Sequence, residues 1–291
     1  MLGPLEPLLG GPDTSWRWLL GVLALPAVLV FFYRWFLPES PRYLLVEGRV
    51  SAANAVLARL AANRLRPRPT TEPPADVLGV AEGQRLPRER VRLVEIFAGR
   101  LARYTAVIWI VSAMTFGAQV TITSFMPTVL VARGLDVSTS LAYTTVINIG
   151  GLIGAVLASV FGYRFRRRIV LGYGAVVAVV IAIAFGFSGS MAWVLLLGGV
   201  LQLMFILLNT TTWVWAPELY PTRVRAFGTG ASVTVALVSA SLLPLLAGMI
   251  FDASGAVGIF ILVAALYVIM AVAVRFGPET LGTALDEAPS A

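Results

Sequence analysis

The chain contains no cysteine, no histidine and no lysine, and only 13% of its residues are charged. The first two absences exclude disulfide bridges, thiol nucleophiles, histidine-ligated metals and histidine general bases. The third leaves arginine as the only basic residue, and no aspartate or glutamate lies in the middle of a long apolar run. Because most catalytic groups are missing, the sequence predicts a protein that is not an enzyme and holds neither a metal nor another cofactor.

Apolar residues make up 58% of the chain and are gathered in long runs. Crossing a bilayer takes about 20 residues, and runs of that length with almost no charge are not soluble core helices. The sequence therefore predicts an all-α protein with seven transmembrane helices, a multi-pass protein of the cell membrane surrounded by the lipid bilayer. The predicted spans cover residues 16–37, 104–131, 141–161, 169–187, 191–215, 228–250 and 257–276.

The 22 arginines are distributed unevenly around these spans. Twelve lie between the first and second spans, and only Arg17 and Arg133 fall on the opposite side of the membrane. Cytoplasmic loops are the arginine-rich ones, so we predict an external N-terminus and a cytoplasmic C-terminus. The net charge of +7 then reflects membrane topology, and no nucleic-acid partner is expected.

This topology predicts four regions. They are an external N-terminus with the first span (1–37), a cytoplasmic arginine-rich linker (38–103), a six-helix unit (104–276) and a cytoplasmic tail (277–291). Within the linker, apolar residues at helical spacing predict an amphipathic surface helix in residues 41–65 and a helical approach to the second span in residues 88–103.

Three proline-anchored motifs each follow a span: PESPRYLL at 38–45, PELYPTRVRAFG at 217–228 and PETLG at 278–282. A fourth segment, GYRFRRR at 162–168, lies between two other spans. Pro38, Pro217 and Pro278 are predicted to end helices at the water interface. Acids and bases at this one depth can form an ionic network that locks helix ends, although the arginines could also serve only to set topology. The predicted gating charges are Glu39, Arg42, Arg164, Arg167, Arg168, Glu218, Arg223, Arg225 and Glu279.

In their order and spacing, these motifs resemble the major facilitator superfamily, in the branch of sugar porters and related metabolite:proton symporters. The resemblance implies that the seven helices correspond to helices 6–12 of a twelve-helix fold, so that this is a partial major facilitator fold lacking the first five helices. It further implies the C-terminal portion of a secondary active transporter that moves a small organic metabolite by alternating access, with the proton as coupling ion. A proton-relay acid would then lie in the missing helices.

The chain departs from the family pattern at two places. Tyr163 and Arg166 stand where the loop after the family's eighth helix has Asp and Gly, which weakens a gating role for that loop. In the first span of the six-helix unit, the glutamine pair, asparagine and tyrosine pair of sugar porters are replaced by other residues. The substitutes are Met114, Thr115, Val120, Ser124 and Phe125. A hexose is therefore disfavoured relative to an aromatic or carboxylic acid-like metabolite.

Polar side chains inside spans tend to face a cavity or the bundle interior. Gln202, Asn209 and Trp213 fall within about 40° of one another on a helix, and Trp213 matches a cavity tryptophan of the family. The predicted substrate-binding residues are Gln119, Thr123, Asn148, Gln202, Asn209 and Trp213. The alternative for each is hydrogen bonding between helices. The ladder Gly150, Gly154 and Ala158 predicts close helix packing.

Other functions remain open at this point. A sugar or drug transporter of the same fold is one alternative, and a membrane protein that senses a ligand without transporting it is another. The short external loops leave little mass outside the membrane, so a receptor ectodomain is not expected.

Overall fold

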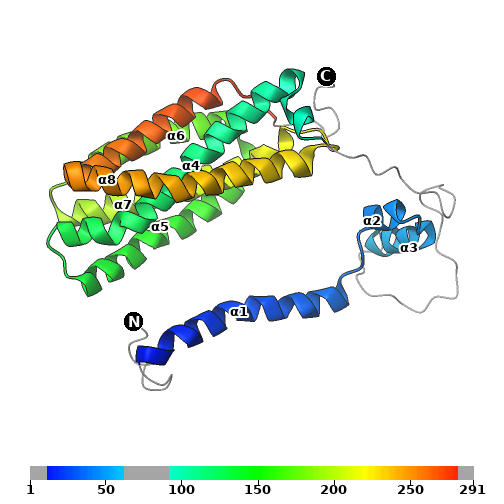
Figure 1. Ribbon diagram of the computed structural model, residues 1–291, viewed down its shortest axis with the longest axis horizontal. Coiled ribbons are helices and arrows are strands. Elements are labelled where there is room, and N and C mark those ends of the chain that lie inside the picture. Colours follow the sequence, from blue (N-terminus) through cyan, green and yellow to red (C-terminus); the bar gives the residue numbers. More distant parts are fainter. Residues whose placement is uncertain (1–11, 62–91, 281–291) are drawn as a thin grey trace. The chain divides into compact units, whose positions relative to one another are not determined.

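The computed structural model describes residues 12–61 and 92–280 of the 291. The chain divides into two compact units, Met1–Glu89 and Arg90–Ala291. Within the described ranges the regular secondary structure is entirely helical (Figure 1). This confirms the predicted all-α class.

The first unit begins with α1 (Pro12–Phe36), on which the predicted span 16–37 falls. The apolar side chains of α1 that the structure describes are exposed, with Phe31 75% accessible. Two short helices follow, α2 (Pro41–Val46) and α3 (Val50–Ala61), with a small core between them. Gly48 between them has a φ of 78°, a left-handed conformation that favours glycine. The prediction of one amphipathic helix over 41–65 is therefore wrong, because the chain turns back at Gly48.

The second unit is a bundle of long helices preceded by a 3₁₀ turn, η3 (Leu93–Phe97). Its helices are α4 (Gly99–Ala132), α5 (Val137–Arg164), α6 (Arg167–Gly186), α7 (Met191–Glu218) and α8 (Arg225–Val274). All five are long and apolar enough to cross a membrane. In Figure 1, α8 lies along α4 and α5 lies along α7, while α6 packs on α7 and α8.

Helix α8 is 50 residues long and reverses direction at Gly255. A straight helix of that length would extend about 75 Å, more than twice the thickness of a hydrocarbon core. Gly255 has φ 66° and ψ −159°, a region that is essentially open to glycine alone. The residues after Gly255 return alongside the bundle (Figure 1), so the predicted spans 228–250 and 257–276 are the two arms of α8.

Aromatic rings and glycines set the distances between helices. Phe185 of α6 packs on Phe260 of α8 at 4.3 Å between ring centroids. On α5, a β-carbon at Gly150 would lie 2.0 Å from the carbonyl oxygen of Gly199, and one at Gly154 would lie 2.5 Å from that of Leu203. The α5 and α7 backbones are therefore in direct contact, which confirms the predicted close packing.

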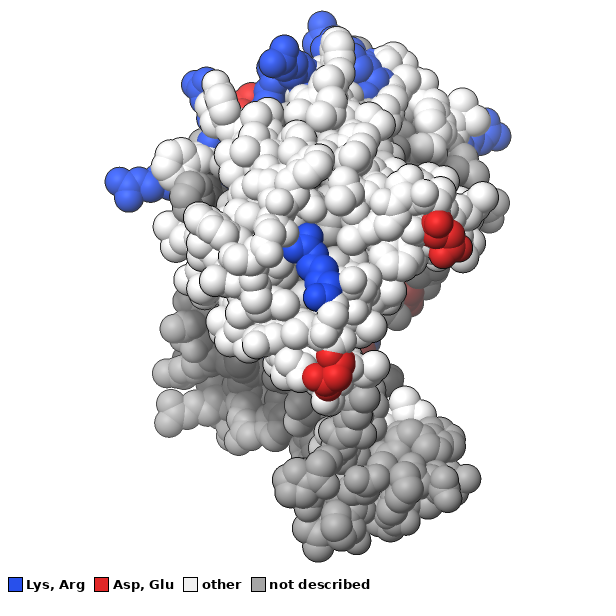
Figure 2. Space-filling model, turned by 90° about the vertical axis from the view of Figure 1, so that its left-hand side faces the viewer, with Lys and Arg blue, Asp and Glu red and all other residues white. Residues whose placement is uncertain are grey.

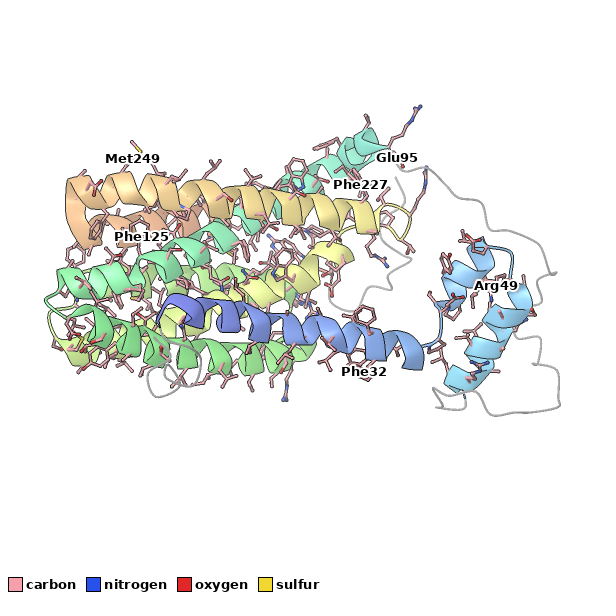
Figure 3. All side chains as sticks on the ribbon, turned by 60° about the horizontal axis from the view of Figure 1, so that its bottom comes forward. Phe32, Arg49, Glu95, Phe125, Phe227 and Met249 are labelled. Atoms are coloured by element: carbon pink, nitrogen blue, oxygen red, sulfur yellow. The ribbon has the colours of Figure 1, made fainter. Side chains whose placement is uncertain are left out.

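Large apolar side chains cover the outside of the bundle. Met249 is 72% exposed and points away from the bundle in Figure 3, whereas Phe125 lies between helices and packs against Phe251. Leu152 and Leu245 are 70% and 68% exposed. So much exposed apolar surface is typical of a protein whose solvent is lipid.

The helix ends differ in two details from the predictions. Pro217 does not end α7, which continues to Glu218, so the proline lies inside the last turn. Residues 88–103 were predicted as a helical approach, of which 88–91 lie outside the described residues. In the rest, Ala98 is extended and Gly99 has a φ of 51°, so η3 and α4 are separate. The hydroxyl of Thr105 donates to the carbonyl of Ile96 at 2.7 Å and ties η3 to α4.

Candidate functional site

Three segments that are far apart in the sequence meet at one end of the bundle. Arg167 at the start of α6 extends Nη2 to within 3.2 Å of Oε1 of Glu218, the last residue of α7. The other carboxylate oxygen of Glu218 accepts a hydrogen bond from the hydroxyl of Thr280, in the segment after α8. The neighbouring Glu279 accepts the backbone N–H of Arg167 through its Oε1 at 3.2 Å. We call these four residues the end cluster.

The end cluster is mostly shielded from solvent. The Arg167 and Glu218 side chains are 10% and 20% exposed. Taking charges out of water is unfavourable unless they are paired and hydrogen-bonded, and both conditions hold here. The end cluster therefore brings together residues from three of the sequence motifs: GYRFRRR, PELYPTRVRAFG and PETLG. The missing acid at Tyr163 does not prevent it, because Glu218 on another helix supplies the negative charge.

Two other predicted gating charges of the second unit donate to backbone carbonyls at helix ends. Arg168 donates from Nη2 to the carbonyl of Arg275 at 2.6 Å, linking α6 to the end of α8. Arg225 donates from Nε to the carbonyl of Tyr220 at 3.2 Å. The Arg164 side chain is exposed at the end of α5.

An exposed ion pair marks the same end of the bundle. Arg223 approaches Glu95 of η3 at 3.3 Å, with side chains 53% and 27% exposed. Figure 3 shows Glu95 and Phe227 at this end. Arg103 of α4 adds a hydrogen bond from Nε to the carbonyl of Phe276 at 3.0 Å. Thr280, Glu95 and Arg103 were not predicted from the sequence, and only Thr280, adjacent to Glu279, lies in a motif that indicates it.

The first motif belongs to the first unit and has a different partner there. Glu39 pairs with Arg49 at 3.2 Å, and both side chains are more than half exposed. Arg49, which is labelled in Figure 3, was not among the predicted charges. The side chain of Arg42 lies outside what the structure describes.

A polar contact joins α4 and α7 away from both ends of these helices. Asn209 donates from Nδ2 to Oε1 of Gln119 at 2.7 Å. On the side toward the end cluster, one turn along each helix, Trp213 meets Phe116 edge to face, with 6.1 Å between centroids. An amide pair and an aromatic pair are therefore stacked on two antiparallel helices.

The remaining predicted substrate residues are less closely grouped. Gln202 is buried and lies against α5, because a β-carbon at Gly151 would be 3.6 Å from its Nε2. Thr123 on α4 and Asn148 on α5 are exposed. The structure thus brings Gln119, Asn209 and Trp213 together, with Gln202 two turns away on α7. In residues 12–61 and 92–280, no three acidic side chains are close enough to hold a metal ion.

Arg133 organises the opposite end of the bundle. Its guanidinium donates to the carbonyl of Phe185 in the last turn of α6 at 3.1 Å and to that of Ser188, just beyond the helix, at 2.7 Å. Its charge also complements the helix dipole there. Figure 2 looks onto this end, where charged side chains are sparse. From the sequence, Arg133 was notable only as one of the two arginines on the side opposite to all the others.

Next to Arg133, Asp136 caps the start of α5. It accepts hydrogen bonds from the hydroxyl of Ser138 and from the backbone N–H of Thr139. The bond from Ser138 is the largest of several contacts that hold the pKa of Asp136 below its usual value. Arg133 and Asp136 therefore give the α4–α5 connection a defined conformation at both of its ends.

The family model described as "Sugar (and other) transporter" matches residues 8–291. The chain belongs to this family. This places it among the sugar porter-type proteins of the major facilitator superfamily, and it is a multi-pass membrane protein. The relatives are named as transport proteins.

Individual relatives are similar along almost the whole chain. The inner membrane metabolite transport protein YdjE of Escherichia coli is 27% identical over 94% of this chain and 61% of its own length. The putative metabolite transport protein YwtG of Bacillus subtilis is 26% identical, over 94% and 60%. The niacin transporter NiaP of Acinetobacter baylyi is 24% identical, over 94% and 61%. The chain thus spans about three fifths of the length of these relatives.

Proposed function

We propose that the second unit is the C-terminal half of a proton-coupled carrier that moves a small aromatic or carboxylic acid-like metabolite by alternating access. The observation that carries this proposal is the stacked pair of contacts between α4 and α7. Asn209 and Gln119 are 2.7 Å apart, and Trp213 and Phe116 lie one turn further along the same two helices.

This arrangement suits a flat ligand with one polar end. The amides of Asn209 and Gln119 offer both donors and acceptors, so they can exchange their mutual hydrogen bond for bonds to a carboxylate or amide of the ligand. The rings of Trp213 and Phe116, one turn away, can pack on an aromatic face. A hexose would need many hydrogen-bonding groups, and the positions that supply them in sugar porters hold Met114, Val120 and Phe125 here.

The end cluster fits the gating part of the same proposal. The contacts among Arg167, Glu218, Glu279 and Thr280 hold one end of α6, one end of α7 and the segment after α8 together, and we place this end at the cytoplasmic side. Helices held together in this way can rock as a unit around a fixed binding site. Because no carboxylate lies mid-span between residues 104 and 276, we assign these helices to substrate binding and gating, and not to the proton relay.

The similarity to the niacin transporter NiaP suggests pyridine carboxylates as first ligands to test. Binding of nicotinate, benzoate and glucose to the purified 291-residue chain would be measured by isothermal calorimetry. Uptake into proteoliposomes would be followed, with and without an inward proton gradient, for a chimeric carrier in which the first five helices of a relative precede this chain, because the proton relay is assigned outside residues 104–276. We expect the aromatic acids to bind to the 291-residue chain and glucose not to bind, and the chimera to show gradient-stimulated uptake that a protonophore abolishes. Binding of glucose but of neither acid would overturn the substrate class, and binding with uptake that ignores the gradient would overturn the coupling.

A further inference from the structure

A cavity of about 370 Å³ opens between α6 and the second arm of α8, at the end of the bundle that carries the end cluster. Its volume lies within the roughly 300–1,000 Å³ typical of ligand pockets. It is separate from the amide and aromatic pairs, since none of Gln119, Asn209 or Trp213 lines it.

The wall of the cavity has a charged end and an apolar end. Arg166, Arg168 and Arg275 line the charged end together with Glu279, which leaves two net positive charges. The Nη2 of Arg168 is held by the carbonyl of Arg275 at 2.6 Å, which fixes the guanidinium beside the end of α8. That bond uses one of five N–H donors, so a guanidinium in this position still has donors for an anion. The Oε1 of Glu279 accepts the backbone N–H groups of Arg167 and Thr280, which anchor its charge at the α6 terminus.

The apolar end continues onto the outer surface of the bundle. Gly172, Tyr173 and Val176 line it from α6, and Tyr173 and Val176 are 74% and 53% exposed. A β-carbon at Gly172 would already contact Val274 at 3.9 Å, so the glycine helps to keep the space open. Tyrosine is enriched where membrane meets water, because its ring is apolar and its hydroxyl is polar.

We propose that this cavity binds a phospholipid with an anionic headgroup. The phosphate lies among Arg166, Arg168 and Arg275, and an acyl chain follows the apolar side past Gly172 and Val176. Two observations favour a lipid over a free anion: the apolar end opens onto the lipid-facing surface, and the charges lie at the cytoplasmic boundary proposed from the arginine distribution. Basic pockets between transmembrane helices on that side are suited to anionic headgroups.

The test is native mass spectrometry of the full chain with phosphatidylglycerol and phosphatidylcholine in competition. We expect the wild-type chain to retain phosphatidylglycerol preferentially. Arg166→Gln/Arg275→Gln should reduce that preference by about tenfold, because two of the three positive charges are lost. The control Arg100→Gln/Arg164→Gln removes two exposed arginines outside the cavity and should keep the preference. Equal loss in the control, or no loss in the cavity variant, would overturn the proposal.

A second variant separates the lipid from a free anion and does not alter charge. Gly172→Leu places a side chain in the apolar end and improves helix propensity, so α6 should still form. It should lower phosphatidylglycerol retention as much as the double variant does. If retention is unchanged, or if millimolar inorganic phosphate displaces the lipid from the wild-type chain, the site recognises an anion and not a lipid.

Discussion

Arg167 and Glu218 are separated by 51 residues in the chain, yet they form a 3.2 Å ion pair with little exposure to solvent. The pair joins the first residue of α6 to the last residue of α7. The pair therefore holds these two helix ends together, and it is the part of the proposed gate that is simplest to test.

Removing one partner of this pair should destabilise the protein strongly. Glu218→Ala removes the carboxylate that pairs with Nη2 of Arg167 in a shielded position, which costs on the order of 3 kcal/mol. The double variant Arg167→Met/Glu218→Leu should recover most of that loss, because neither charge remains. Thermal unfolding in detergent, analysed as a double-mutant cycle, measures the coupling.

The exposed pair of Arg223 and Glu95 provides a matched control. Its side chains are 53% and 27% exposed, so Glu95→Gln, which removes the charge and keeps an oxygen for the backbone N–H of Arg92, should cost less than about 1 kcal/mol. If Glu95→Gln and Glu218→Gln had equal effects, shielding would not be what makes the end cluster important.

The contact between α5 and α7 predicts that alanine substitutions at Gly150 and Gly199 have opposite effects. Gly150→Ala should prevent correct packing, since its β-carbon would lie 2.0 Å from the carbonyl oxygen of Gly199. Gly199→Ala should be tolerated, or stabilising by up to about 1 kcal/mol, because its β-carbon meets nothing within 4 Å. The monodisperse fraction after purification and the melting temperature would distinguish them, and a normal Gly150→Ala protein would contradict the packing described.

Trp213 should contribute to ligand binding without contributing to membrane insertion. We expect Trp213→Ala to weaken binding of an aromatic acid by about tenfold, as loss of one aromatic contact of about 1.4 kcal/mol implies. Trp193→Ala is the control, because Trp193 lies near the other end of α7 and is 57% exposed. If both variants bind with wild-type affinity, Trp213 serves helix packing alone.

Arg133 is expected to be the most sensitive charge at the opposite end. Arg133→Gln removes the charge and the guanidinium bonds to the carbonyls of Phe185, Gly186 and Ser188, so it should cost about 1–3 kcal/mol. Arg100→Gln, at an exposed position, should be close to neutral. Hydrogen exchange should rise at the last turn of α6 in the Arg133 variant, and unchanged protection there would count against the cap.

The predicted topology can be tested by labelling, since the natural chain has no cysteine. Cysteines introduced at Ser138 and Ser190, both exposed, should react with a membrane-impermeant maleimide added to intact cells. One introduced at Ser51 should react only after the cells are opened. Reaction of the Ser51 variant in intact cells would reverse the proposed orientation.

The sequence predicted the helices well because a bilayer imposes long apolar runs, and the apolar runs of the second unit all fall on helices or arms of helices. The breaks within helical regions were harder to predict. Gly48 and Gly99 adopt left-handed conformations that end or separate helices, and nothing in their neighbouring residues distinguishes them from glycines inside helices. Pro217 shows the reverse case, in which a helix breaker is accommodated within a final turn.

The sequence predicted which side chains belong to the candidate sites. It could not predict which of these side chains contact each other across two helices. Helical periodicity places Asn209 and Trp213 on one face of α7, but their partners Gln119 and Phe116 depend on how α4 is rotated against α7. That rotation is set by the packing of many side chains. Thr123 and Asn148 illustrate the same limit, because each is polar and within a span, yet both are exposed in the structure.

The reversal at Gly255 brings the second arm of α8 back to the end of the bundle where its first arm begins. Glu279 and Thr280 can reach Arg167 and Glu218 because the second arm runs back along the bundle. One residue without a β-carbon, located at the far end of the bundle, therefore decides at which end residues 275–280 lie. A β-branched residue at position 255 would oppose this backbone conformation, and the first contacts to be lost would be those of the end cluster, at the other end of the bundle.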